Sequence, residues 1–209
     1  MWPDKNQTRE LLQGARQGDR SAVNRLLGRH RKALHRMIQL RLDQKIRGRV
    51  DVSDVVQDVL VEASRRLPKY LENPVMSFHL WVRQIAKDRI VDAHRRHRVS
   101  AKRSVDREQS LAVPTGLDKS ASELVAQLRD PDLTPAAAAT RHEMTRLVEE
   151  ALLQLDSQDC EIIFMRHYEL LSNQEIAELL DLSEPAAGMR YLRAIRRLRE
   201  LIVNANRGG

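Results

Sequence analysis

The sequence contains few of the residues that carry redox chemistry or stack nucleic-acid bases. Its single cysteine, Cys160, excludes an internal disulfide and fits a reducing compartment. We expect this thiol to be buried in a helix rather than reactive, because free cysteine is among the most buried residue types. Aromatic residues make up only 3% of the chain. That scarcity argues against modules that bind bases on exposed aromatic platforms.

Long apolar runs and common catalytic motifs are also missing from the sequence. No stretch approaches the ~18 residues of a membrane span, and the polar start of the chain does not resemble a signal peptide. We therefore expect a cytoplasmic protein without membrane insertion. No Gly-rich phosphate loop, H-E-x-x-H helix or cysteine cluster occurs. His94 and His97 are spaced like metal ligands, but the neighbouring arginines would repel a cation. The sequence predicts no enzyme activity, cofactor or metal site.

Basic residues outnumber acidic ones in this chain of 209 residues. The 36 Lys and Arg residues against 29 Asp and Glu residues give a formal net charge of +7, and the isoelectric point is about 10.0. Such a balance favours a polyanionic partner without identifying it. The length suffices for one large or two small domains.

Apolar residues recur with helical spacing almost throughout, and strand-like alternation is absent. The sequence therefore predicts an all-α fold. Two small helical domains are expected at residues 7–99 and 134–206. Residues 100–133 between them contain two prolines, a glycine and no sustained apolar face. They are predicted to form a long flexible linker with one weak helix at residues 122–129, and Pro135 marks the start of the next helix.

One segment of the first block separates into two faces on a helical wheel. Its apolar face is formed by Val55, Val56, Val59, Leu60 and Ala63. Its opposite face is formed by Asp54, Gln57, Asp58 and Glu62, with Val61 among them. A solvated face would explain the charges, but the stripe is purely acidic and we expect no i,i+4 ion pair to support it. An apolar residue at the centre of a charged ring is what a docking surface requires. Both interpretations remain open.

A second long helix is predicted from Phe78 to Arg98. Its buried face is formed by Phe78, Trp81, Val82, Ile85 and Ala86. Its far side carries the basic residues Arg83, Lys87, His94 and Arg98. Eight Lys and Arg residues against two Asp residues lie between positions 83 and 103. This basic rod suits a phosphate backbone, with a solvated face as the alternative.

The last part of the chain contains the signals of a helix-turn-helix in order. Ser172 and Glu175 have the spacing of a capping box, which begins a short helix. Asp181 tolerates the left-handed backbone of a turn, and Ser183 is placed to cap the next helix. Pro185 falls in the first turn of that helix, where its missing N–H is not needed. Such a unit places its second helix in the major groove of duplex DNA.

The second helix of this unit also has two faces. Its inward face is formed by Ala187, Tyr191, Ala194, Ile195, Leu198 and Ile202. Among the opposite residues, Arg190 is expected to contact a base or the backbone, and Arg193 and Arg197 to contact phosphates. Ala186 and Met189 are suited to thymine methyl groups. Gly188 weakens the helix by ~1 kcal/mol relative to Ala.

Three segments resemble bacterial sigma factors of the extracytoplasmic-function (ECF) group. DVSDVVQDV at residues 51–59 resembles the polymerase-binding helix of sigma region two. SFHLWVRQIAKDRIVD at residues 77–92, followed by Arg95 and Arg96, resembles the promoter-opening helix of that region. Residues 155–199 resemble region four with its helix-turn-helix. Three such motifs in this order form a pattern that is specific to this family.

The resemblance implies a function for each face. Asp54, Gln57 and Asp58 match positions that dock on the clamp of the largest subunit of core RNA polymerase, and Val61 and Glu62 extend that face. The basic helix would lie along the promoter element near the start site. A preceding loop, residues 68–77, would capture an unstacked base.

Further roles follow from the same resemblance. The contacts of the base-capturing loop are Lys69, Tyr70 and Asn73. Region four would read the distal promoter element, with Ser172 at the start of its reading unit, while its first helices pack on the polymerase flap. An anti-sigma factor is a further partner that the family suggests and that no residue identifies.

Two other functions compete with a promoter-recognition subunit. A stand-alone helix-turn-helix regulator would bind DNA without polymerase, but such proteins usually carry a ligand pocket or a dimer interface. An enzyme acting on nucleic acid would need a catalytic constellation that the spacing of the acids does not show. A sigma factor gains specific DNA affinity with core polymerase, whereas a repressor binds DNA unaided.

Overall fold

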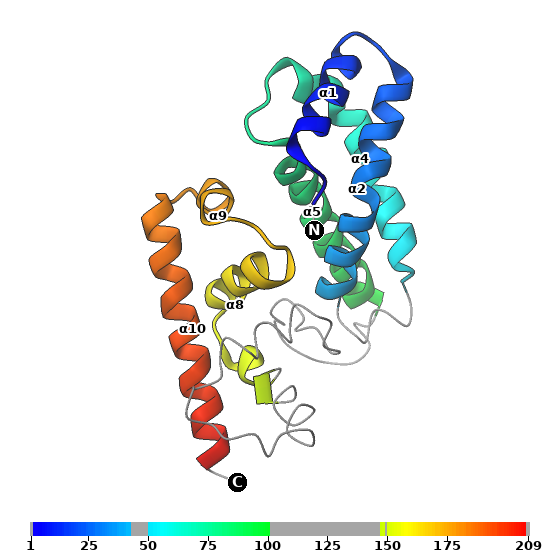
Figure 1. Cartoon of the computed structure of the whole chain (residues 1–209). Coiled ribbons are helices and arrows are strands. Elements are labelled where there is room, and N and C mark those ends of the chain that lie inside the picture. The colour runs from blue at the N-terminus through cyan, green and yellow to red at the C-terminus, as the bar shows by residue number, and fades with distance from the viewer. Residues whose placement is uncertain (1, 43–49, 101–146, 149, 208–209) are drawn as a thin grey trace, which may run out of the picture. The chain divides into compact units, whose positions relative to one another are not determined.

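The computed structural model describes residues 2–42, 50–100, 147, 148 and 150–207. Among these residues all regular elements are helices (Figure 1), which confirms the all-α class. They belong to two compact units, Met1–Ala112 and Val113–Gly209. The expected linker, its weak helix and the expected helix start at Pro135 lie outside the described residues. No helix among those described is both long and apolar enough to span a bilayer.

The first unit contains α1 (Lys5–Arg16), α2 (Arg20–Arg41), α4 (Val52–Glu72) and α5 (Phe78–Ser100). An aspartate precedes each of the first three helices, and its carboxylate accepts hydrogen bonds from backbone N–H groups of the first turn. Asp4 accepts from two such groups at 3.0 and 3.1 Å. Asp19 and Asp51 each accept from one group at 2.7 Å. These caps satisfy donors that a helix leaves unpaired at its start.

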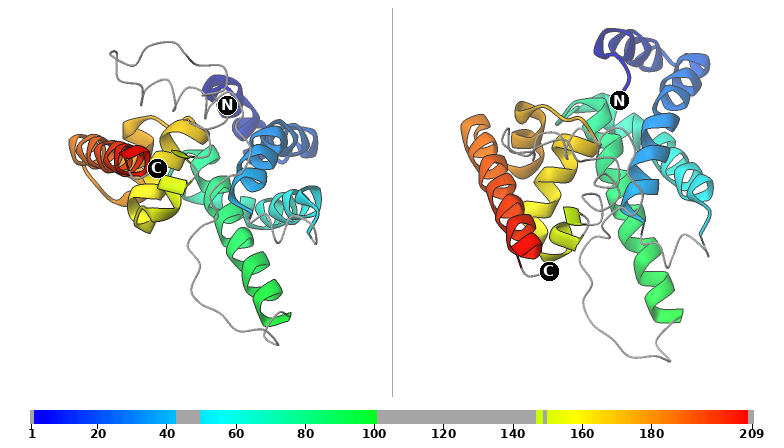
Figure 2. Two further views of the ribbon diagram at one scale, coloured as in Figure 1. Left: turned by 90° about the horizontal axis from the view of Figure 1, so that it is seen from below. Right: turned by 60° about the horizontal axis from the view of Figure 1, so that its bottom comes forward.

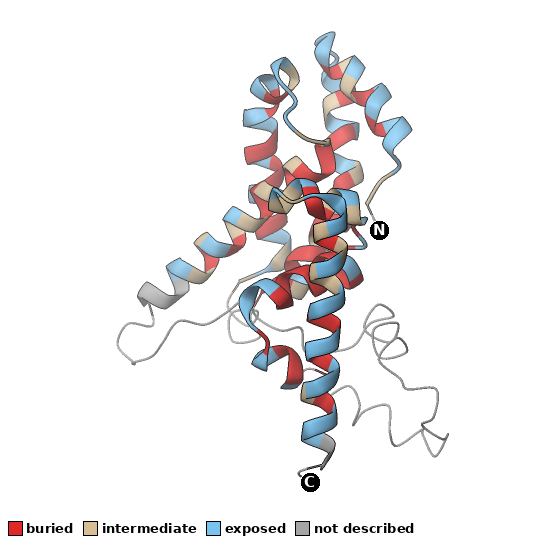
Figure 3. Cartoon of the chain, turned by 90° about the vertical axis from the view of Figure 1, so that its left-hand side faces the viewer, coloured by how far each residue is buried: buried red, intermediate tan, exposed pale blue. Residues whose placement is uncertain are grey.

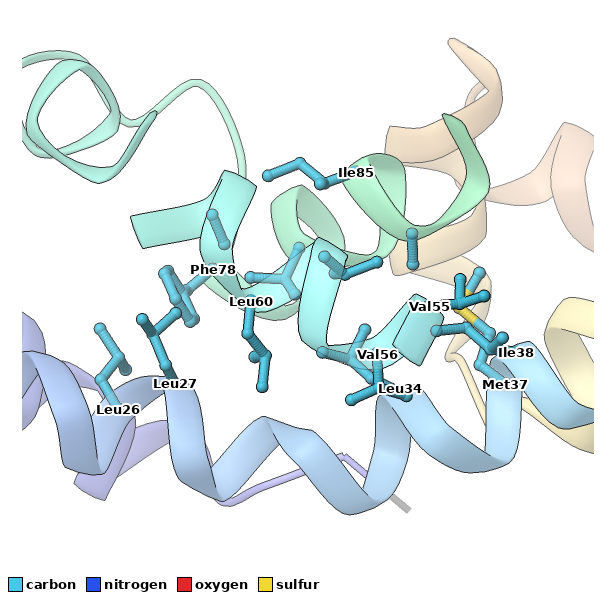
Figure 4. Packing of buried hydrophobic residues seen from close by; sticks show 14 of the residues in the cluster. Leu26, Leu27, Leu34, Met37, Ile38, Val55, Val56, Leu60, Phe78 and Ile85 are labelled. Atoms are coloured by element: carbon cyan, nitrogen blue, oxygen red, sulfur yellow. The ribbon is translucent and has the colours of Figure 1, made fainter. Parts of the chain in front are cut away.

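The core of this unit lies where α2, α4 and α5 meet (Figure 4). Leu34 and Ile38 of α2 are fully buried, as are Val59 of α4 and Val82 of α5. The five apolar residues expected on the inner face of α4 are all buried, which confirms that face. Each buried Val, Leu or Ile side chain contributes roughly 1.5–3 kcal/mol when it is removed from water. Trp81 is half-buried and packs against this core.

The helix α4 continues past Pro68, although the sequence predicted a loop from that residue to residue 77. A proline inside a helix removes one hydrogen bond and costs ~3 kcal/mol. Leu67 and Tyr70 on either side of it are buried at 3% and 6% exposure, and their burial offsets that cost. The backbone N–H of Asn73 donates to the carbonyl of Lys69 at 3.3 Å and closes the last turn.

The second unit contains α8 (Ser157–Ile163), the π-helix η1 (Phe164–Tyr168), α9 (Asn173–Leu180) and α10 (Glu184–Arg207). Its core is formed by Ile162, Ile163, Leu171, Ile176, Ala187, Ala194 and Leu198. In Figure 3 buried and exposed residues alternate along α10, as expected for a helix with one apolar face. Cys160 is buried in α8, as predicted.

Alanine substitutions at two helical glycines of the first unit should change the free energy of unfolding in opposite directions. Gly28 is exposed within α2, and an added Cβ would meet no described heavy atom within 4 Å. Gly28→Ala should therefore raise the free energy of unfolding by about 0.5–1 kcal/mol. An added Cβ at Gly14 in α1 would lie 2.8 Å from the Cβ of Ala22 in α2. Gly14→Ala should lower the free energy of unfolding, because the two helices must separate. Urea unfolding followed by circular dichroism measures both variants, and equal stabilisation would contradict this packing.

Candidate nucleic-acid and protein interfaces

The outer side of α4 presents an acidic face, which we define as Asp54, Gln57, Asp58 and Val61. All four side chains are exposed, and Val61 is 58% exposed although it is apolar. Arg31 of α2 donates a hydrogen bond to the side-chain oxygen of Gln57 at 2.7 Å. The valines on the opposite side of the helix hold it in the rotation that keeps the two aspartates in solvent. These four residues lie where the sequence predicted them.

Glu62 does not extend the acidic face, contrary to the sequence prediction. Its side chain is only 7% exposed and lies within 3.0 Å of Arg89 on α5. It also accepts hydrogen bonds from Arg65 at 2.8 Å and from Arg66. The expectation that no i,i+4 ion pair supports the stripe is therefore wrong, since Glu62 and Arg66 form one. On the helical wheel Glu62 lies at the border between the two faces, so α5 determines its environment.

The Glu62 carboxylate belongs to a network of charged side chains that joins α4 to α5. The hydrogen bond from Arg65, together with that from Arg66 and the charges of both arginines, lowers the pKa of Glu62 from 4.5 to about 2, despite the opposing effect of burial. Arg89 lies 3.8 Å from Asp92, which in turn lies 3.4 Å from Arg95. A pocket of about 350 Å³ lies at this junction and is lined by Asp58, Val61, Glu62, Arg89, Asp92, Arg95 and Arg96. The acidic face and the basic end of α5 thus adjoin.

Only part of the expected basic side of α5 is accessible. Arg95 and Arg96 are exposed, and Lys87 and His94 are half-buried. The side chain of Arg98 lies outside the described residues. The C-terminal part of α5 projects from the bundle of α1, α2 and α4 in both views of Figure 2.

The prediction that Arg83 lies on the DNA side of α5 is wrong, because this side chain is only 2% exposed. Leu80, three residues before Arg83 and on the same side of the helix, is buried as well. A helical wheel assumes that the side opposite the apolar face meets solvent. That assumption fails at Leu80 and Arg83.

The segment between α4 and α5 is shorter than predicted, and Tyr70 is not one of its exposed contacts. The Tyr70 hydroxyl donates to the carbonyl of Met76 at 2.9 Å. Its ring stacks on Trp81 with ring centroids 4.6 Å apart. Lys69 and Asn73 are exposed, as expected. Tyr70 lies three residues after the buried Leu67, so the apolar periodicity of α4 already indicated its burial.

The helix-turn-helix signals are confirmed in detail. The backbone N–H of Ser172 donates to the Glu175 carboxylate at 2.9 Å, and the N–H of Glu175 donates to the Ser172 hydroxyl at 3.2 Å. Asp181 has the left-handed conformation with φ 53° and ψ 49°. The Ser183 hydroxyl accepts from the N–H of Ala186 at 3.3 Å and caps α10.

The two faces of α10 are also confirmed in outline. All six expected inward residues are buried or half-buried, and Met189 is 56% exposed on the other side. Ala186 is half-buried and Arg193 is exposed. The sequence did not predict that Arg190 and Arg197 bond to α8. Arg197 donates to Asp156 at 2.8 Å and to Asp159 at 2.7 Å, and Arg190 donates to Gln158.

A polar pair fixes α10 against the π-helix η1. The Tyr191 hydroxyl and Nε2 of His167 are 2.7 Å apart. Burial lowers the pKa of His167 to about 4, so the imidazole is neutral at neutral pH. Neutral imidazole leaves one ring nitrogen able to accept a hydrogen bond. Sequence spacing gives no sign of this pair, since its members lie on different elements.

Among the described residues no group of three or more His, Cys, Asp or Glu side chains is arranged to hold a metal ion. The groups that gather on the surface are guanidinium groups, carboxylates and apolar side chains. They suit recognition of charged macromolecules through ion pairs and buried contacts.

Replacing Glu62 by glutamine should destabilise the protein at neutral pH. The pKa of this carboxyl is about 2 in the folded protein and 4.5 ordinarily. Its charge therefore stabilises the fold above about pH 4.5, and that contribution is lost as the pH falls towards 2. The difference in unfolding free energy between the wild type and Glu62→Gln should shrink over this range. Glu72→Gln, at an exposed acid of the same helix, is the control. An undiminished Glu62→Gln difference near pH 3 would contradict the ion-pair network.

Comparison with known proteins identifies the family. The family model described as Sigma-70 region 2 matches residues 24–99, and the one described as Sigma-70, region 4 matches residues 145–198. The chain is 27% identical over 194 residues to the ECF RNA polymerase sigma-E factor of Haemophilus influenzae, covering 93% of this chain and 92% of that protein.

Two further proteins are similar. The chain is 30% identical over 142 residues to the probable RNA polymerase sigma factor RfaY of Xanthomonas campestris pv. campestris, covering 68% of this chain but 31% of that protein. The solved structure of CnrH in complex with the cytosolic domain of CnrY shares the fold, with a TM-score of 0.56 and 24% identity, over 95% of this chain and 98% of that one. The chain belongs to the sigma-70 family and is an ECF-type sigma factor, a subunit that binds core RNA polymerase and directs it to promoters.

Proposed function

We propose that two domains divide the work of initiation. Residues 7–99 bind core polymerase and open the duplex near the start site, and residues 134–206 read the distal promoter element. Residues 100–133 connect the two domains as a linker. The presence of a region 2 match in one unit and a region 4 match in the other supports this division.

The acidic face of α4 is the proposed docking surface for the clamp of the largest polymerase subunit. One observation carries this assignment: an apolar side chain, Val61, is 58% exposed beside Asp58 in a chain of net charge +7. Exposed apolar surface ringed by charge is typical of a protein interface. Because Glu62 is buried among arginines, its part is to hold α4 against α5 rather than to touch the clamp.

Promoter opening is assigned to the end of α4 and to the basic part of α5. Lys69 and Asn73 are the exposed candidates for contact with an extruded base. Arg95 and Arg96 project with the end of α5 and would bind phosphates. Lys87 and His94, which are half-buried, would contribute through their exposed parts. Extruding a base costs a few kcal/mol, and phosphate contacts together with polymerase binding would offset that cost.

In the second unit α10 is the proposed reading helix. Ala186 and Met189 lie in its first turns, where base edges are met. Arg190, Arg193 and Arg197 would supply backbone contacts, with Arg190 closest to the bases. Ser172 at the start of α9 presents an exposed polar group to the same duplex. The earlier helices of this unit, including α8, are proposed to pack on the polymerase flap.

Further aspects of the function follow from these assignments. The protein acts by binding, not catalysis, and works in the cytoplasm with the polymerase. CnrH forms a complex with the cytosolic domain of another protein, CnrY. By analogy, we propose an anti-sigma factor as a partner of this chain.

Reversing two charges on the acidic face should abolish tight polymerase binding. The double variant Asp54→Arg/Asp58→Arg should bind core polymerase about a hundredfold more weakly. The reversed face would bring like charges together at the proposed interface with the clamp, which costs several kcal/mol. Competition with a labelled wild-type chain for purified core polymerase measures this affinity. The control is Glu10→Arg/Glu72→Arg, which reverses two exposed acids of the same unit outside the face. Wild-type affinity in the first variant would remove the proposed docking surface.

A further inference from the structure

Asp156 performs two tasks with one carboxylate. Its Oδ1 caps α8 by accepting from the backbone N–H groups of Gln158 at 3.0 Å and Asp159 at 2.8 Å. Its Oδ2 accepts from Nη1 of Arg197 on α10 at 2.8 Å. The cap fixes the carboxylate against the backbone, so its second oxygen is held in place towards α10.

A second carboxylate holds the same guanidinium nitrogen. Asp159 accepts from Nη1 of Arg197 at 2.7 Å, and Asp159 is only 7% exposed. The Arg197 side chain itself remains 60% exposed. Two carboxylates thus face one arginine, so their negative charge exceeds the positive charge of Arg197.

These groups border a groove of about 580 Å³ along the reading helix. Its lining includes Arg190, Arg193 and Arg197, together with Asp156 and Asp159. A DNA phosphate and a carboxylate are both anions that accept charge-assisted hydrogen bonds from a guanidinium group. A phosphate that approached Arg197 would therefore be repelled by both carboxylates and would compete with them for Nη1.

We infer that Asp156 and Asp159 are internal competitors for DNA phosphate at Arg197, and that they lower the sequence-independent affinity of this sigma factor for duplex DNA. The inference rests on the proposed function of α10. Sequence-independent affinity arises almost entirely from phosphate contacts. The two carboxylates beside Arg197 weaken one such contact, while Ala186 and Met189 on the same helix keep their access to bases. Binding to DNA then depends more on base contacts and on polymerase.

The test compares charge-neutralised variants of the full chain on a random-sequence duplex. Asp156→Asn removes the charge but retains the cap, because asparagine caps helices as well as aspartate. It should bind the duplex several-fold more tightly than the wild type at low salt. The slope of log affinity against log salt should steepen by up to about 0.9, the value for one added phosphate contact. Asp4→Asn makes the same change at the cap of α1 in the other unit and is the control.

Two further variants separate the explanations. In an Arg197→Ala background Asp156→Asn should have no effect, because the arginine that it releases is absent. A gain that persists there would overturn the inference in favour of general charge repulsion. Arg193→Ala, on the same groove, tests the proposed function of α10 by itself. If Arg193→Ala binds the duplex more weakly but Asp156→Asn shows no gain, the inference is overturned and the proposed function of α10 stands. If neither variant changes binding, both the inference and the proposed function of α10 are overturned.

Discussion

The packing of α4 between α2 and α5 determines which side chains of the first unit can meet a partner. Five apolar residues turn one side of this helix into the core, and helical geometry places Asp54 and Asp58 outward. A rotation of α4 by one residue, about 100°, would bury an aspartate and expose a valine. The buried valines therefore hold the acidic face in place, although none of them touches a partner.

Paired charges then decide how much of the basic character of the chain is available to DNA. Glu62 binds three arginines, and Asp156 and Asp159 hold Arg197. Several carboxylates thus serve as internal partners of arginines rather than as solvated surface. The exposed arginines outside these pairs include Arg96 on α5 and Arg193 on α10, whereas Arg95 is exposed but lies 3.4 Å from Asp92. The basic side chains that are available to bind phosphate are therefore fewer than the net charge of +7 suggests.

Local signals in the sequence predicted the helix-turn-helix and the two faces of α4 well. A capping box, a left-handed aspartate and a capping serine act within a few residues, so their outcome does not depend on distant parts of the chain. The errors at Arg83 and Glu62 have a different origin, because a local pattern assigns a charged side chain to solvent and does not show what packs around it. Tyr70 is wrongly predicted to lie in a loop, although the apolar periodicity of α4 indicates its burial. The pairing of Arg197 with Asp156 spans 41 residues, and no spacing rule reaches that far.

Run-off transcription tests most directly whether one chain joins polymerase to promoter DNA through these surfaces. Purified core polymerase and the full chain would be incubated with fragments of the genome that encodes it. We expect transcripts from discrete start sites that share an upstream motif and that core polymerase alone does not produce. A folded chain that adds no transcript to those of core polymerase would contradict this function.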